Sequence, residues 1–295
     1  MSTRDPSICF VIPYFGRWPF WMPFFLASCR ANSTVDWLLF SDCGELDALP
    51  PNVRVVSVSY ADYCARVAGA LGIPFAPSSP YKLCDLKPAL GYIHREELAG
   101  YDFWAFGDLD LILGDLRAYF TAGRLARKDL FSTHERRISG HCCLVRNSPE
   151  MRELFFRVPD WQVRLSAPEH LGFDEGAFSR IFIRRKNWPR LLARIAAQWN
   201  PWFRRAEFIE SYSTPNAKLP WVDGSRNYPQ RWFWREGLLT NDRDGERRFP
   251  YVHFLMWKGD EWKRIPAADI AAYPQVASLP AWQVSTSGFA PLDPI

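Results

Sequence analysis

A bulky apolar run, residues 103–107, passes directly into Asp108-Leu109-Asp110 with no turn residue between them. The run predicts a strand that is buried on both faces, as in the centre of a parallel sheet. Two carboxylates at the end of such a strand are costly to desolvate unless they are paired or bound to a metal. Residues i and i+2 of an extended segment point to the same side, so both carboxylates can converge on one cation. The junction therefore predicts a cation site at the carboxyl end of a buried strand.

Three more apolar runs predict strands of the same sheet, at 8–12, 36–42 and 53–58. The spacing of the apolar residues predicts helices at 20–32, 62–71 and 83–98, followed by strands at 129–133 and 142–146. This order predicts an α/β fold with a Rossmann-like mixed sheet flanked by helices. The pattern is then mostly helical over 150–210 and irregular beyond, apart from a strand-like segment at 251–254.

Charge and cysteine usage limit the classes of function. The chain has 36 Lys and Arg against 32 Asp and Glu, a net charge of +4, which is too small an excess to indicate a nucleic-acid binder. Basic clusters such as Arg184-Arg185-Lys186 are interpreted as solvated helix faces or, alternatively, as contacts with an anionic membrane surface or a phosphorylated acceptor. Seven Cys without paired spacing, no signal peptide and no long apolar run predict a cytoplasmic protein, at most peripheral to the inner face of the membrane.

The chemistry of the acidic junction indicates which ion and which substrate it suits. Mg²⁺ and Mn²⁺ take oxygen ligands and commonly combine a few carboxylates with substrate phosphates. A nucleoside diphosphate sugar needs such an ion, because its diphosphate gains charge as the glycosidic bond breaks. Aromatic residues make up 16% of the chain, and they are expected to serve either in the core or as flat platforms for sugars and bases.

Asp108-x-Asp110 after an apolar strand resembles the DXD motif of GT-A glycosyltransferases, and residues 81–92 are similar to the helix that precedes this motif in capsular and Och1-like sugar transferases, including a small bacterial group of them. The resemblance implies a GT-A fold and transfer of a sugar from a UDP- or GDP-sugar to a hydroxyl of a glycan or glycolipid, with Mn²⁺ or Mg²⁺ as cofactor, in cell-surface polysaccharide synthesis. It also implies a donor-binding half at 1–148 and an acceptor-side half at 149–295, within one continuous globular domain.

The resemblance further implies roles for individual residues. Metal ligands would be Asp108, Asp110 and a His from late in the chain, His253. The nucleotide would be contacted by Pro13, Tyr14 and Phe15 in the turn after the first strand, by Asp42 at the end of the second strand, and by Lys82 and Asp85 in the segment before the motif. Lys258, late in the chain, would offset the charge of the diphosphate.

Two further segments have a functional and a structural interpretation. His141 follows Gly140, so it either donates a hydrogen bond to the donor sugar or lies in an ordinary bend. Asp174 and Glu175 either stabilise the start of a helix or supply an acceptor-side carboxylate, with Asp174 favoured as the catalytic residue beside Asp110.

Two other classes of protein are alternatives. A metal-dependent nucleotidyltransferase or phosphodiesterase also uses paired Asp on an α/β sheet, but residues 13–19 lack the Gly-rich, Lys-containing phosphate loop expected of it. A non-catalytic carbohydrate-binding protein would use the tryptophans as platforms and would not need two converging carboxylates.

Overall fold

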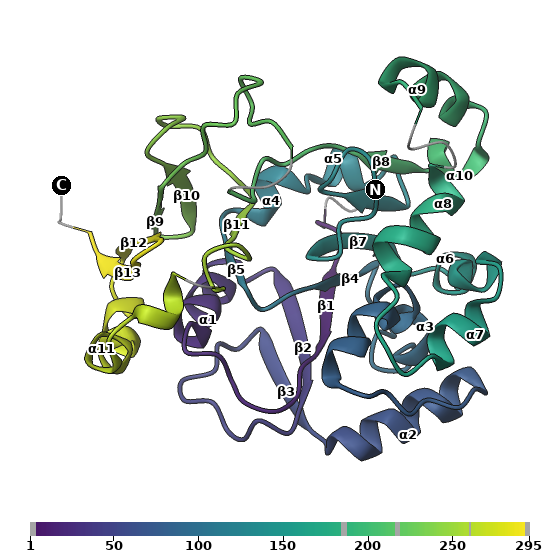
Figure 1. Ribbon diagram of the computed structural model, residues 1–295, viewed down its shortest axis with the longest axis horizontal. Coiled ribbons are helices and arrows are strands. Elements are labelled where there is room, and N and C mark those ends of the chain that lie inside the picture. The colour runs from purple at the N-terminus through teal and green to yellow at the C-terminus, as the bar shows by residue number, and fades with distance from the viewer. Residues whose placement is uncertain (1–3, 184–187, 216–218, 260, 293–295) are drawn as a thin grey trace.

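The computed structural model describes residues 4–183, 188–215, 219–259 and 261–292 (Figure 1). The basic cluster Arg184-Arg185-Lys186 lies outside these ranges.

A seven-stranded mixed sheet forms the centre of the molecule, with the strand order β3-β2-β1-β4-β7-β6-β8. Strands β3, β2, β1 and β4 run parallel, β7 is antiparallel to both of its neighbours, and β6 pairs with β8 in parallel. The predicted α/β class and the mixed sheet are thus confirmed. Its strands are β1 (Ile8–Pro13), β2 (Val35–Ser41), β3 (Val53–Ser57), β4 (Phe103–Gly107), β6 (Leu130–Ser132), β7 (Cys142–Arg146) and β8 (Ala206–Phe208).

Alternate residues of the central strands face two apolar layers, which explains why these strands are apolar throughout. Val11 of β1 packs in one cluster with α2 (Tyr60–Leu71), whereas Phe10 packs in the other with α1 (Met22–Ala31). The ends of α2 follow from its sequence: the Ser59 hydroxyl accepts a hydrogen bond from the backbone N–H of Asp62, and Gly72 closes the helix in a left-handed conformation.

The remaining helices are short. They are η1 (Pro80–Ala89), α3 (Leu90–Ile93), α4 (Leu116–Tyr119), α5 (Ala122–Leu125), α6 (Pro149–Arg152), η2 (Leu154–Arg157), α7 (Trp161–Ser166), η3 (Phe173–Phe178), α8 (Ser179–Phe182), α9 (Arg190–Gln198), α10 (Pro201–Arg204), η4 (Trp262–Arg264) and α11 (Ala267–Ala277). Within the described part of the chain, no helix has the length and apolarity needed to cross a bilayer.

Two predicted helices differ from the structure. The single helix expected at 83–98 is a 3₁₀ helix, η1, followed by the short α3. Pro88 lies inside η1, and its missing N–H disfavours a regular α-helical turn at that point. The segment that begins at Phe173 is π-helical before it becomes α8.

A second, four-stranded antiparallel sheet lies in the part of the chain that was expected to be helical or irregular. Its order is β10-β9-β12-β13, and α11 packs between it and α1. The core here is aromatic: Trp234 and Trp282 stack with ring centroids 4.8 Å apart, and Phe24 of α1 stacks on Phe289. Many tryptophans therefore serve in the core. The strands are β9 (Arg231–Arg235), β10 (Leu238–Asn241), β12 (Ala281–Ser285) and β13 (Gly288–Pro291).

A two-stranded ribbon connects the two parts of the molecule. Strand β5 (Leu111–Leu113) pairs antiparallel with β11 (Tyr251–His253), and Leu111 lies opposite His253. The ribbon continues at Gly114, whose N–H donates to the carbonyl of Pro250 at 2.9 Å. A Cβ atom at this position would collide with the carbonyl oxygen of Phe249, so the close approach requires glycine.

Replacing this glycine tests whether the ribbon holds the two parts together. Gly114→Ala should lower the free energy of unfolding by about 1–3 kcal/mol, because the new methyl group has no room. Denaturant unfolding of the purified protein measures the change. Gly123→Ala is the matched control: its Cβ would meet nothing within 4 Å, so its stability should be equal or slightly higher. Equal losses in both variants would contradict the steric argument.

Candidate active site

The strand order of the main sheet reverses beside β1, because β2 lies on one side of it and β4 on the other. Ligands of open α/β sheets bind outside the carboxyl ends of the strands at such a switch point. A cavity of about 1290 Å³ opens there, and its wall includes Pro13, Tyr14 and Phe15 after β1 together with Asp108 and Asp110 after β4. This volume exceeds that of most single small-molecule sites, so it has room for two substrates.

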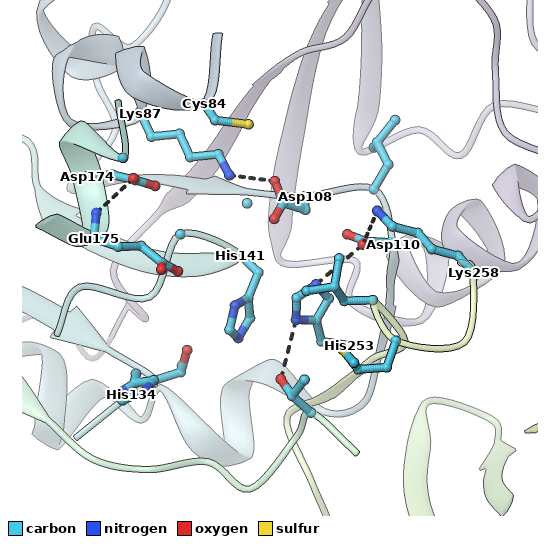
Figure 2. Close-up of a pocket in the computed structure, with 18 of the residues that line it drawn as sticks. Cys84, Lys87, Asp108, Asp110, His134, His141, Asp174, Glu175, His253 and Lys258 are labelled. Atoms are coloured by element: carbon cyan, nitrogen blue, oxygen red, sulfur yellow. Dashed lines mark hydrogen bonds and ion pairs between the residues drawn. The ribbon is translucent and has the colours of Figure 1, made fainter. Parts of the chain in front are cut away.

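Three potential metal ligands meet in this cavity: Asp108, Asp110 and His253, whose nearest ligand atoms all lie within 4.8 Å of one another (Figure 2). The β5–β11 pairing explains the meeting, because it places His253 opposite Leu111, the residue that follows Asp110. A histidine from late in the chain thus lies beside the acidic junction.

The His253 ring is held so that its Nε2 atom faces the carboxylates. The ring stacks on His141, with centroids 4.2 Å apart, and its Nδ1 atom lies 3.3 Å from the Thr214 hydroxyl. Nε2 is buried, makes no hydrogen bond to any described residue and lies 3.3 Å from Oδ2 of Asp110. Burial, and then the neighbouring His253, hold the pKa of His141 well below its usual value, so His141 is a neutral support. A buried imidazole nitrogen and two carboxylates form a donor set that fits a divalent cation.

Two lysines add positive charge to the same place. Nζ of Lys87 lies 2.5 Å from Asp108, and Nζ of Lys258 lies 2.5 Å from Asp110. Burial by itself lowers the pKa of each lysine, but the carboxylates outweigh it, and both values are raised. Burial likewise raises the pKa of Asp110, but His253 and Lys258 outweigh this effect and hold it well below its usual range. Lys87, Lys258 and Asp110 are therefore charged at neutral pH, and each carboxylate uses only one of its oxygens in its ion pair with a lysine.

An acidic pair lies on the opposite wall of the cavity. Figure 2 shows Asp174 and Glu175 across from Asp108, with Lys87 between them. Asp174 is buried and accepts a hydrogen bond from the backbone N–H of Glu175 at 2.7 Å. Burial raises the pKa of Asp174 to about 6, although Lys87 acts against the shift. A Cβ atom at Gly140 would lie only 2.7 Å from Oδ2 of Asp174, so a larger residue there would displace this carboxylate. A carboxylate with such a pKa can exchange a proton near neutral pH.

Most of the residues expected at the site line this cavity: Pro13, Tyr14, Phe15, Asp108, Asp110, His141, Asp174, His253 and Lys258. Asp42 does not. It is exposed and accepts a hydrogen bond from the N–H of Gly16 at 2.8 Å, so it holds the turn after β1 and does not face the cavity.

Lys82 and Asp85 were expected to contact the nucleoside, but the structure buries both of them away from the cavity. Nζ of Lys82 donates to Asp85 and to the carbonyls of Arg164 and Glu169. Asp85 also accepts the backbone N–H groups of Leu171 and Phe173. The pair therefore ties η1 to the segment that carries Asp174, and it positions that wall of the cavity.

The 3₁₀ geometry of η1 explains this difference. Side chains at i and i+3 eclipse in a 3₁₀ helix, so every third residue shares a face. Tyr81, Cys84 and Lys87 line the cavity, whereas Lys82 and Asp85 share the buried face. Lys87 was absent from the predicted site, although it stands three residues after Cys84 in the same segment. Only a 3₁₀ helix, with its period of three residues, would have placed Lys87 on the same face as Cys84 and so in the predicted site.

A structural role for Asp85 predicts a large effect on stability without any ligand. Asp85→Ala should lower the free energy of unfolding by on the order of 3–5 kcal/mol, because it leaves the buried Lys82 charge without its carboxylate. Asp42→Ala, which removes one hydrogen bond at an exposed position, should cost about 1 kcal/mol. Denaturant unfolding of the ligand-free proteins measures both. A small effect of Asp85→Ala would contradict the positioning role.

The raised pKa of Asp174 predicts how stability depends on pH. Its ionisation is disfavoured in the folded state, so the penalty is absent below pH about 4 and complete above pH about 6. Asp174→Asn should therefore stabilise the protein at pH 8, by on the order of 2 kcal/mol, and the gain should disappear as the pH falls below about 4. Thermal unfolding across this range measures it, with the exposed Asp47→Asn as control. A gain that does not depend on pH would contradict the burial argument.

A family model described as a family of unknown function (DUF6625) matches residues 10–268. No curated protein matches the chain. Similar solved structures include the galactosyltransferase LgtC with donor and acceptor sugar analogues (12% identity, 71% of this chain and 90% of that one, TM-score 0.36). Others are mouse xyloside xylosyltransferase 1 (11%, 71% and 87%, 0.37) and a glycosyltransferase involved in glycosylation of the major capsid of PBCV-1 (9%, 70% and 83%, 0.37). At such identities and TM-scores, these likenesses carry no argument about function.

Proposed function

The chain belongs to the family of unknown function DUF6625, and we propose that it is a metal-dependent glycosyltransferase of the GT-A type. It would transfer a sugar from a UDP- or GDP-sugar to a hydroxyl of a glycan or glycolipid acceptor, in the synthesis of a cell-surface polysaccharide. One observation carries the proposal: the ligand set Asp108, Asp110 and His253 lies at the switch point of the sheet, between two charged lysines.

The residues around this ligand set suit a diphosphate. Asp108, Asp110 and His253 would hold Mn²⁺ or Mg²⁺, which when bound offsets the charge that develops on a leaving diphosphate. Lys87 and Lys258 would add two fixed positive charges in a partly buried place, where charge stabilisation is stronger than in water. Pro13–Phe15 would contact the nucleoside at the carboxyl end of β1.

The opposite wall would bind and activate the acceptor. In an inverting reaction, the oxygen of the acceptor hydroxyl bonds to the anomeric carbon, the bond from that carbon to the diphosphate oxygen breaks, and the hydroxyl proton passes to a carboxylate. Two observations support Asp174 in this role: it lines the same cavity, and its pKa of about 6 leaves it mostly ionised at neutral pH. The positive charge of Lys87, which interacts with both Asp108 and Asp174, would reduce the repulsion between these two carboxylates.

Two alternatives have less support. A nucleotidyltransferase would have a Gly-rich, Lys-containing phosphate loop near the first strand, but the turn after β1 in this chain is PYFGRWP and contains no lysine. A non-catalytic sugar-binding protein would present its tryptophans to solvent, whereas Trp232, Trp234 and Trp282 form the core of the second sheet.

Ligand-dependent stability tests the donor site first. The melting temperature should be measured with UDP, GDP and CDP and their sugars, with and without Mn²⁺. A nucleotide at a hundred times its Kd should add about 2.7 kcal/mol to the free energy of unfolding. We expect one nucleotide to stabilise the protein only when the metal is present, and Asp108→Asn to remove that effect. Asp47→Asn, on the exposed surface, should keep it.

Turnover then tests the reaction. Release of free nucleoside diphosphate from the stabilising donor should require Mn²⁺ or Mg²⁺ and should be lost in Asp110→Ala with the fold preserved. Unchanged turnover in that variant would refute the proposal. So would the absence of a metal-dependent shift with every nucleotide.

A further inference from the structure

Helix α9 exposes its large apolar side chains and buries a small one. Figure 1 shows it at the outer edge of the molecule, beyond α8 and α10. Leu191 is 70% exposed, Ile195 is 52% exposed and Trp199, just after the helix, is 87% exposed, whereas Ala197 is buried. Positions 191, 195 and 199 follow one another at intervals of four residues and form one stripe, with Leu192 beside it. An ordinary surface helix turns its apolar stripe toward the core, whereas α9 turns its apolar stripe toward solvent.

The sequence around α9 is strongly basic. Residues 176–206 contain no Asp or Glu and eight basic residues: Arg180, Arg184, Arg185, Lys186, Arg190, Arg194, Arg204 and Arg205. Among those whose side chains the structure describes, Arg180 and Arg204 are exposed, whereas Arg205 pairs with Asp129 and Glu150. An exposed apolar stripe within a basic segment suits an anionic membrane, because the apolar side chains can enter its interior while the basic residues contact its surface.

We propose that α9, with Trp199, is an interfacial helix that binds an anionic lipid surface. Leu191, Ile195 and Trp199 would enter the boundary between headgroups and acyl chains, while the exposed Arg180 and Arg204 contact the headgroups. Tryptophan is enriched at this boundary, because its ring is apolar and its N–H remains hydrated.

The same charges disfavour a second copy of this chain as the occupant of the stripe. Two copies that met through α9 would bring two acid-free basic segments together, and like charges across an interface are costly. With an anionic membrane the electrostatic interaction is favourable instead, since each basic residue near the membrane surface is attracted to it. The proposal is independent of glycosyl transfer, because none of the α9 residues whose side chains the structure describes lines the cavity.

Vesicle co-sedimentation of the full chain tests it. We expect the protein to bind phosphatidylcholine vesicles that contain phosphatidylglycerol at least about tenfold more tightly than vesicles of phosphatidylcholine alone, and to release them as salt is raised. Ile195→Asp should weaken binding by on the order of tenfold, because it places a carboxylate in the apolar stripe. Trp199→Gln should also weaken it, and this variant lies beyond the end of the helix, where it does not threaten folding.

Two controls separate this inference from others. Val163→Asp changes a residue of α7 that is 71% exposed, and it should leave vesicle binding unchanged. Asp110→Asn should also leave it unchanged, so a failure of the proposed activity does not affect this test. The proposal is overturned if the wild-type protein does not bind anionic vesicles or if folded Ile195→Asp and Trp199→Gln bind as well as wild type. It is also overturned if Ile195→Asp only converts a dimer to a monomer in light scattering.

Discussion

The short ladder between β5 and β11 brings the late part of the chain to the acidic junction. It places His253 opposite Leu111 and so beside Asp110, and Lys258 follows closely enough to reach the same carboxylate. The carboxylates would otherwise end a buried strand with only Lys87 nearby, a costly arrangement for two negative charges. The cation site, the charge balance and the link between the two sheets therefore depend on the same few backbone hydrogen bonds, which is why Gly114 must stay small.

Much of the main sheet could be predicted from the sequence because its strands obey a local rule. Buried parallel strands are continuous apolar runs, and β1, β2 and β4 occur within a residue or so of their predicted positions. Asp108, Asp110 and His253 could be named together, but only the resemblance to DXD transferases suggested the histidine. The second sheet was missed because its strands are short and form only two local hairpins, β9–β10 and β12–β13, until β9 and β12 pair across a long stretch of chain. The alternation of buried and more exposed residues in RWFWR, LLTN and AWQVS was a local signal of these strands.

The segment 80–89 shows how a residue role can fail when the helix type is wrong. Asp85 was assigned to the donor through the resemblance of residues 81–92 to the helix before the DXD motif, but a period of three turns it inward beside Lys82 and turns Lys87 into the cavity. A buried ion pair of this kind adds little net stability, because desolvation offsets the attraction. Its effect is geometric: Asp85 also fixes the backbone at Leu171 and Phe173, and the fold thereby sets the distance between the wall that carries Asp174 and the wall that carries Asp108.

The ribbon also has a consequence for the order in which the chain folds. During synthesis the strands β1 to β4 emerge early and can assemble, but β5 has no strand partner in the described chain other than β11. Until the ribosome has released the segment around His253, the edge of β5 stays open, and Asp110 lacks both His253 and Lys258 as neighbours. The Asp110 carboxylate is therefore among the last charges of the protein to be balanced, and premature termination before β11 would leave the nascent chain with an exposed apolar strand edge.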